Sequence, residues 1–182
     1  MGPILITDAS VLINLVASGV AAEILGGCGW EFHVCPDVLG EVKLLRDRET
    51  GEEHPIDLSP LFTAGLLALV QPESDVEFEL LIEYSALLGH GKGEAMCFAL
   101  AEARNLPVAI DDARAARKAC RRNPGVMTLD TFQILKTWQQ GAGKTDEELG
   151  RLLKAIYRYA RHLPATNHPE YEWWNRCYGA GS

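Results

Sequence analysis

Short apolar runs alternate along this chain with stretches in which apolar residues recur every three or four positions, a pattern that predicts alternating strands and helices. The expected strands are PILITD, WEFHVC, GLLALVQP, NLPVAIDD and GVMTLD. The expected helices lie in ASVLINLVASG, VAAEILGG, PDVLGEVKLLRDR, DVEFELLIEYSALLG, KGEAMCFALA, ARAARKACRRN, TFQILKTWQQG and KTDEELGRLLKAIYRYARHL. Strands alternating with helices indicate an α/β fold with a parallel sheet covered on both faces.

Local signals set several boundaries. Pro36 suits the first turn of the helix predicted from there through KLLRDR, and Thr145 with Glu148 has the spacing of a capping box. The polar, proline-bearing residues 47–60 are predicted to be a loop or mobile insertion. We expect one domain over residues 1–160 and a C-terminal extension over 161–182, whose final Gly-Ser is typical of an expression-tag remnant.

Composition supports a single globular domain, since 182 residues, 47% of them hydrophobic and 23% charged, can bury a sizeable core. No apolar stretch approaches the roughly 20 residues that span a bilayer, and the first residues lack the basic flank of a secretory signal. A cytoplasmic protein without a membrane segment is expected. The five cysteines have no CxxC spacing and predict reduced core thiols rather than disulfides or zinc ligands. The histidines form no metal motif, and His90 is interpreted as a loop side chain.

Acidic residues follow three of the predicted strands. Asp8 ends the first strand, Asp111 and Asp112 end PVAI, and Asp130 follows VMT. Ligands of parallel α/β sheets collect at the carboxyl ends of the strands. Glu41 and Glu94 lie on helices that can direct them to the same edge, so that four or more acids are expected round one cavity. Clustered carboxylates repel one another unless cations neutralise them, and oxygen ligands favour Mg²⁺ or Mn²⁺.

Other chemistries find no support in the sequence. It contains no GxSxG, no GxxxxGK[ST] and no GxGxxG after a strand. GHGKGE resembles a phosphate cradle but lacks the strand that should precede one. The favoured hypothesis is therefore a metal site that activates water and orients a phosphodiester.

The order of these motifs resembles the PIN-domain family, metal-dependent nucleases whose bacterial members include VapC-like toxins. The likeness rests on ITDASVLINL, the helix with Glu41, GHGKGEAMCFALA, VAIDDARAARKA and VMTLDTFQILKTWQQG, in this order over about residues 4–160. It implies a PIN-like three-layer α/β/α fold with a central parallel sheet of four or five strands. It also makes Asp8, Glu94, Asp111, Asp112 and Glu41 catalytic or metal-binding acids, with Ser10 in support. Asp130 is a further metal-binding acid in this hypothesis, although many relatives have a small residue there.

Each acid also has an ordinary structural explanation. Asp8 can cap the following helix, and Glu94 can interact favourably with the positive end of its helix. One of Asp111 and Asp112 is expected to be a turn residue or cap, and Glu41 can be a solvated helix residue.

A net charge of −8 argues against a protein that binds nucleic acid over its whole surface. The helix after Asp112 nevertheless carries Arg114, Arg117, Lys118, Arg121 and Arg122 on one face, where a phosphate backbone can lie, and Lys92 can assist. A solvated helix face explains these cations equally well. Trp173 and Trp174 are predicted to pack against the domain or a partner chain rather than to stack on bases.

These features predict a Mg²⁺- or Mn²⁺-dependent endoribonuclease that hydrolyses RNA phosphodiester bonds. The resemblance further implies a homodimer and, for a toxin of a toxin–antitoxin pair, an antitoxin protein that occupies the site. The alternatives are a non-catalytic binding module that uses its acidic pocket for a partner's Arg or Lys, and a hydrolase of small phosphate esters.

Overall fold

A computed structural model describes residues 2–89 and 91–181, so His90 lies outside the described residues. The five predicted strands are present and form one parallel sheet in the order β5-β2-β1-β6-β7. They are β1 (Ile4–Thr7), β2 (Glu31–Val34), β5 (Leu67–Leu69), β6 (Val108–Ala109) and β7 (Thr128–Leu129). The α/β class and the parallel sheet are thus confirmed.

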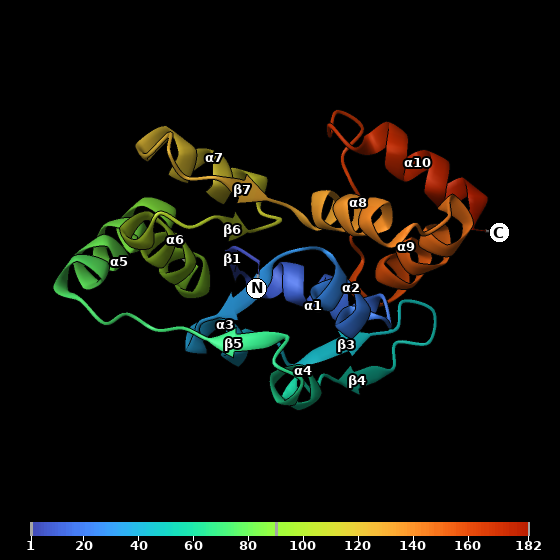
Figure 1. Ribbon diagram of the computed structural model, residues 1–182, viewed down its shortest axis with the longest axis horizontal. Helices are drawn as coiled ribbons and strands as arrows, with labels where there is room; N and C mark the ends of the chain where they lie inside the picture. Colours follow the sequence, from blue (N-terminus) through green and yellow to red (C-terminus); the bar gives the residue numbers. More distant parts are fainter. Residues whose placement is uncertain (1, 90, 182) are drawn as a thin grey trace.

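Helices flank the sheet on both sides, an arrangement compatible with a three-layer α/β/α fold (Figure 1). On one side are α5 and α6, and on the other are α1, α2, α8 and α9, with α10 outermost against α9. The helices are α1 (Ala9–Ala17), α2 (Ala21–Gly27), α3 (Pro36–Glu41), α4 (Ser59–Thr63), α5 (Asp75–Leu88), α6 (Lys92–Arg104), α7 (Ala113–Arg122), α8 (Thr131–Ala142), α9 (Asp146–Ala160) and α10 (Tyr171–Ala180).

The strand order of the sheet reverses at β1, its central strand. From β1 the chain builds outward through β2 and β5 on one side, and later through β6 and β7 on the other. β1 pairs with β2 through Ile6 and His33, and with β6 through Ile6 and Val108. In open parallel sheets such a switch point leaves a crevice at the carboxyl ends of the two strands, where ligands bind. Asp8 and Asp111 follow the two strands that border it.

Two sequence-based predictions between residues 36 and 60 were wrong. The helix that begins at Pro36 ends at Glu41, and residues 44–46 form β3 (Leu44–Arg46) instead of continuing it. The supposed loop 47–60 contains β4 (Glu53–Pro55), which pairs antiparallel with β3, and the start of α4.

A turn explains why this segment is ordered. Asp47 is buried and accepts hydrogen bonds from the backbone N–H groups of Glu49 and Thr50, while Gly51 adopts the left-handed conformation at φ 75°. Arg158 on α9 also donates to Asp47 at 2.6 Å. Residues more than a hundred positions apart therefore hold the turn, which no local pattern reveals.

Other predictions agree with the structure. The Thr145–Glu148 capping box is present at α9. All five cysteines are free thiols, four of them buried. Trp173 is buried and donates to Gln139 at 2.8 Å, so it packs within the chain as expected. Over the part of the chain described, no single helix is long and apolar enough to cross a membrane; α1 and α2 reach that length only together, with a 117° bend between them.

Candidate functional site: an acidic cleft at the sheet switch point

Asp8 is the innermost acid of the site. It follows β1 and is only 4% exposed. It also caps α1, as expected for an Asp that precedes a helix. Its Oδ2 accepts hydrogen bonds from the Ser10 hydroxyl at 2.7 Å and the Ser10 backbone N–H at 3.3 Å. Its Oδ1 is buried and has no hydrogen-bond partner among the described residues. A buried, unpartnered carboxylate oxygen is costly, and it marks a position where a ligand or cation would be favourable.

Four predicted acids line one cleft of about 470 Å³. They are Asp8, Glu41, Glu94 and Asp112, and Ser10 lines it as well. Asp8 precedes α1, Glu41 ends α3, Glu94 lies in the first turn of α6 and Asp112 caps α7. Four segments that are distant in sequence thus bring carboxylates to the crevice at the switch point.

The glycines of GHGKGE make room for these carboxylates. A Cβ atom at Gly91 would lie 2.5 Å from Oε2 of Glu94, closer than side chains tolerate. A Cβ at Gly93 would lie 3.1 Å from Val38 and 3.2 Å from Oε1 of Glu41. The glycines therefore allow α6 to start directly beside α3, with both glutamates at the cleft.

Burial and mutual repulsion raise the pKa values of three acids of the cleft, Glu94, Glu41 and Asp8. The pKa of Glu94 is raised to about 7, mainly by burial and then by Asp8, Asp112 and Glu41, with Lys118 opposing the shift. The pKa of Glu41 is raised by burial, Asp8 and Asp37. Burial also raises the pKa of Asp8, which the Ser10 hydrogen bond partly offsets. Strongly perturbed carboxyl groups that share a cleft are candidates for functional groups.

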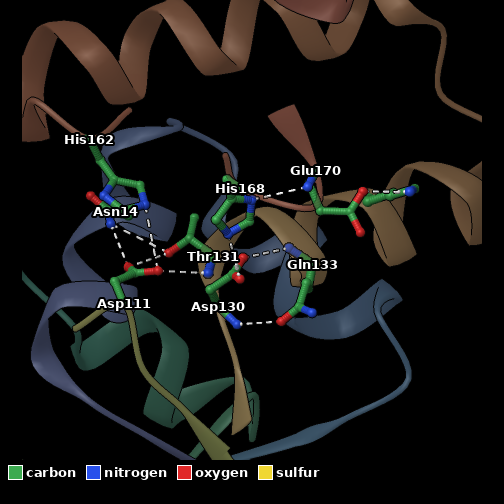
Figure 2. A network of polar contacts seen from close by, with 9 residues as sticks. Asn14, Asp111, Asp130, Thr131, Gln133, His162, His168 and Glu170 are labelled. Atoms are coloured by element: carbon green, nitrogen blue, oxygen red, sulfur yellow. Dashed lines mark hydrogen bonds and ion pairs between the residues drawn. The ribbon is translucent and has the colours of Figure 1, made fainter. Parts of the chain in front are cut away.

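Asp111 does not line the cleft, and its carboxylate lies in a network of donors (Figure 2). Its carboxylate accepts from the Thr131 backbone N–H at 2.8 Å, the Thr131 hydroxyl at 2.6 Å and Asn14 Nδ2 at 2.8 Å. Nε2 of His162 lies 3.5 Å away. Of the Asp111/Asp112 pair, Asp112 therefore reaches the cleft, while Asp111 ties α1 and α8 to the end of β6.

Asp130 likewise has its oxygens engaged elsewhere (Figure 2). It caps α8 in a capping box with Gln133, and its Oδ2 lies 3.0 Å from Nε2 of His168. Nδ1 of His168 accepts the backbone N–H of Glu170, so the proton of the neutral ring is on Nε2 and is donated to Asp130. The structure does not bring Asp130 to the cleft with the other four acids.

Basic residues adjoin the acidic cleft. A neighbouring pocket of about 420 Å³ shares Glu94 and Asp112 with it and is also lined by Arg114 and Lys118. Arg122 belongs to a different environment, because it pairs with Glu83 and Glu102. The remaining predicted cations, Lys92, Arg117 and Arg121, have exposed side chains.

The side chains of the cleft are of the types that bind a hard divalent cation, but they do not converge as a complete set of ligands. Among residues 2–89 and 91–181, no three Asp, Glu, His or Cys side chains converge as a cation-binding group. The cleft nevertheless supplies oxygen ligands, an unpartnered buried oxygen on Asp8 and excess negative charge. Mg²⁺ keeps several waters and needs only one or two direct carboxylates, so Asp8 with Glu94 or Asp112 fits its requirements.

The residues that contact Asp111 and Asp130 were not predicted from the sequence. Asn14, His162 and His168 were not assigned to any site, although each contacts a predicted acid. Asn14 lies 97 positions from Asp111, and His168 lies 38 from Asp130. No local spacing signals such contacts.

Comparison with protein-family models, curated proteins and solved structures gives no match for this chain. The fold and the site define the protein as an α/β protein with a five-stranded parallel sheet and an acidic cleft at its switch point.

Proposed function

We propose that this protein is a Mg²⁺- or Mn²⁺-dependent endoribonuclease whose active site is the acidic cleft. The observation that carries the proposal is the gathering of Asp8, Glu41, Glu94 and Asp112 in one cleft at the switch point of the sheet. The raised pKa values of Asp8, Glu41 and Glu94 indicate negative charge that the described residues leave insufficiently compensated. The resemblance of the motif order to PIN-domain nucleases supports the same conclusion.

The side chains have distinct roles in the proposal. Asp8, oriented by Ser10, and Glu94 would hold the cation together with Asp112, and Glu41 would complete the shell. A bound divalent ion supplies a water of lowered pKa and stabilises charge on the phosphodiester oxygens. Asp111 acts as a positioning residue, because its bonds to Thr131 and Asn14 fix the chain that leads into Asp112.

Arg114 and Lys118 favour a polymeric substrate over a small phosphate ester. They border a pocket that continues directly from the acidic cleft through Glu94 and Asp112. A strand whose scissile phosphate lies in the cleft would have a neighbouring phosphate within reach of these cations.

The test is incubation of the protein with a mixed RNA pool in Mn²⁺ and in chelator, compared with nucleotide phosphate esters. Cleavage of RNA in Mn²⁺ alone is expected. Asp8→Asn should abolish it, whereas Asp75→Asn, at an exposed position at the start of α5, should not. Full activity of Asp8→Asn would refute the assignment.

One observation favours a second candidate, a binding module that receives a partner's Arg or Lys in the cleft. The acids do not converge on one point among the described residues, and a guanidinium needs no such convergence. Calorimetric titration with Mn²⁺ separates the two candidates. A nuclease should bind Mn²⁺ and lose this binding in Asp8→Asn, whereas a binding module should bind no Mn²⁺ in the cleft. A homodimer and an antitoxin partner stay predictions that follow from the resemblance.

A further inference from the structure

A second cavity, which shares no lining residue with the acidic cleft, lies between α9, α10 and the turn that joins β3 to β4. It has a volume of about 510 Å³, and its walls include Arg48, Lys154, Tyr157, Arg158 and Tyr178. The guanidinium carbon of Arg48 lies 4.3 Å from the Tyr157 ring centre, and the ammonium of Lys154 lies 5.6 Å from that of Tyr178. In a chain of net charge −8, this local gathering of cations and phenols is unusual.

Two of the three cations are available to an anionic ligand. Arg158 already pairs with Asp47 and, at 3.2 Å, with Glu49, which also lines the cavity. By contrast, Arg48 and Lys154 pair with no acidic side chain within the described ranges, and Lys154 donates only to the Gly181 carbonyl at 2.9 Å. An exposed guanidinium and an ammonium with free donors are the groups that bind phosphate.

An apolar pocket adjoins this cationic cavity. It has a volume of about 200 Å³, is lined by Val16, Leu45, His54 and Tyr159, and meets the cavity at Tyr159. The Arg158 guanidinium carbon lies 5.4 Å from the centre of the Tyr159 ring, so the apolar and cationic regions are in direct contact. His54 meets Tyr159 edge-on at 5.8 Å and adds a ring nitrogen able to hydrogen-bond a heterocycle.

We propose that these two pockets form a nucleotide-binding site separate from the acidic cleft. The base occupies the pocket at Tyr159 and His54, and the phosphate lies between Arg48 and Lys154. The ligand is a nucleotide, either free or at the end of an RNA strand, because both present one planar ring beside a phosphate. The site does not depend on the proposed nuclease activity.

The experiment is calorimetric titration of the full chain, in EDTA, with AMP, adenosine, inorganic phosphate and a short 5′-phosphorylated oligoadenylate. AMP should bind at least about tenfold more tightly than adenosine or phosphate alone, because it occupies both pockets. Tighter binding of the oligonucleotide than of AMP identifies an RNA end as the ligand, and equal binding identifies the free nucleotide.

Variants assign the binding to this site. Arg48→Gln and Lys154→Gln should each weaken AMP binding about tenfold or more, since each removes a charge-assisted hydrogen bond. Arg151→Gln is the matched control, because Arg151 is an exposed cation of the same helix that pairs with Glu147. Near-ultraviolet circular dichroism checks that each variant is folded. If Arg48→Gln disturbs the turn, the AMP affinity of Lys154→Gln tests the proposal.

Three results would overturn the proposal. They are no binding of AMP or oligoadenylate up to millimolar concentration, undiminished binding by both variants, and equal competition by a poly-glutamate peptide. The last would show that the cavity responds to negative charge alone and has no preference for a nucleotide.

Discussion

Two groups of acids lie at the carboxyl edge of the same sheet, and they differ in how they are neutralised. Asp111 and Asp130 are met by Thr131, Asn14 and His168, which donate hydrogen bonds to them. In the cleft, Asp112 is also met by backbone donors, but Asp8 keeps one unpartnered oxygen, and Glu94 has a pKa near 7. The comparison teaches that position at a strand end does not by itself make a carboxylate functional. What distinguishes a functional candidate is charge that the fold leaves uncompensated.

The largest effect is expected for cleavage by Asp8→Asn. Changes to residues that hydrogen-bond the ligands of a metal lower metal affinity or activity about 10- to 100-fold, so loss of a carboxylate that binds the metal directly should lower the cleavage rate at least about a hundredfold. Initial rates on RNA in Mn²⁺ measure it, with Asp75→Asn as the control. Thermal unfolding in chelator should change little, because the amide can still accept the Ser10 hydrogen bonds.

Asp111→Ala should chiefly affect stability. The substitution leaves both donors of Thr131 without an acceptor, and Asn14 Nδ2 keeps only the long hydrogen bond of 3.4 Å to the Thr131 hydroxyl, at a place where Asn14 and Thr131 are buried. A decrease of about 2–4 kcal/mol in the free energy of unfolding is expected from urea denaturation. Asp75→Ala should change it by less than about 0.5 kcal/mol. Unchanged stability of Asp111→Ala would contradict a structural role for its network.

Glu94→Gln should stabilise the chain in a pH-dependent manner. The folded pKa of Glu94, about 7, lies above its ordinary value of 4.5, so ionised Glu94 destabilises the folded state. Below about pH 4.5 variant and wild type should be equally stable, and the variant should gain as the pH rises through 7. Because Glu94 is only half-buried, solvent screening limits the gain to about 1–2 kcal/mol.

Urea unfolding in EDTA at pH 4.5 and pH 8 measures this gain. Mn²⁺ at pH 8 should reverse the order by stabilising the wild type more than the variant, because a cation favours the ionised carboxylate. Equal stability of the two proteins at both pH values would contradict the assignment of uncompensated charge to the cleft.

The smallest effect is expected for His168→Ala. It removes the hydrogen bond to Asp130 and the one accepted from the backbone N–H of Glu170, both at a partly exposed position, and should cost about 1 kcal/mol of stability. RNA cleavage at a temperature well below the unfolding midpoint should be unchanged, since Asp130 does not line the cleft. A loss of more than tenfold in cleavage would show that Asp130 functions together with the cleft acids.

Short-range patterns predicted much of the framework. The periods of apolar residues located all five strands of the parallel sheet, and the spacing of Thr145 and Glu148 identified a real capping box. These features depend on residues within a few positions of one another. The same reasoning failed for residues 42–55, where the β3–β4 hairpin depends on Arg158 reaching Asp47 from α9.

The sequence by itself determined the order along the chain of the five strands of the parallel sheet and placed acids after three of them, because the periodicity of apolar side chains is a local property. Only the tertiary structure decided which acids share a cleft. Asp8, Glu41, Glu94 and Asp112 come together through the packing of α3 and α6 and the sheet order, whereas Asp111 and Asp130 receive donors from residues far along the chain. The physical reason is that the free energy of a carboxylate depends on its burial and on nearby charges and donors, and these are fixed only when the chain folds.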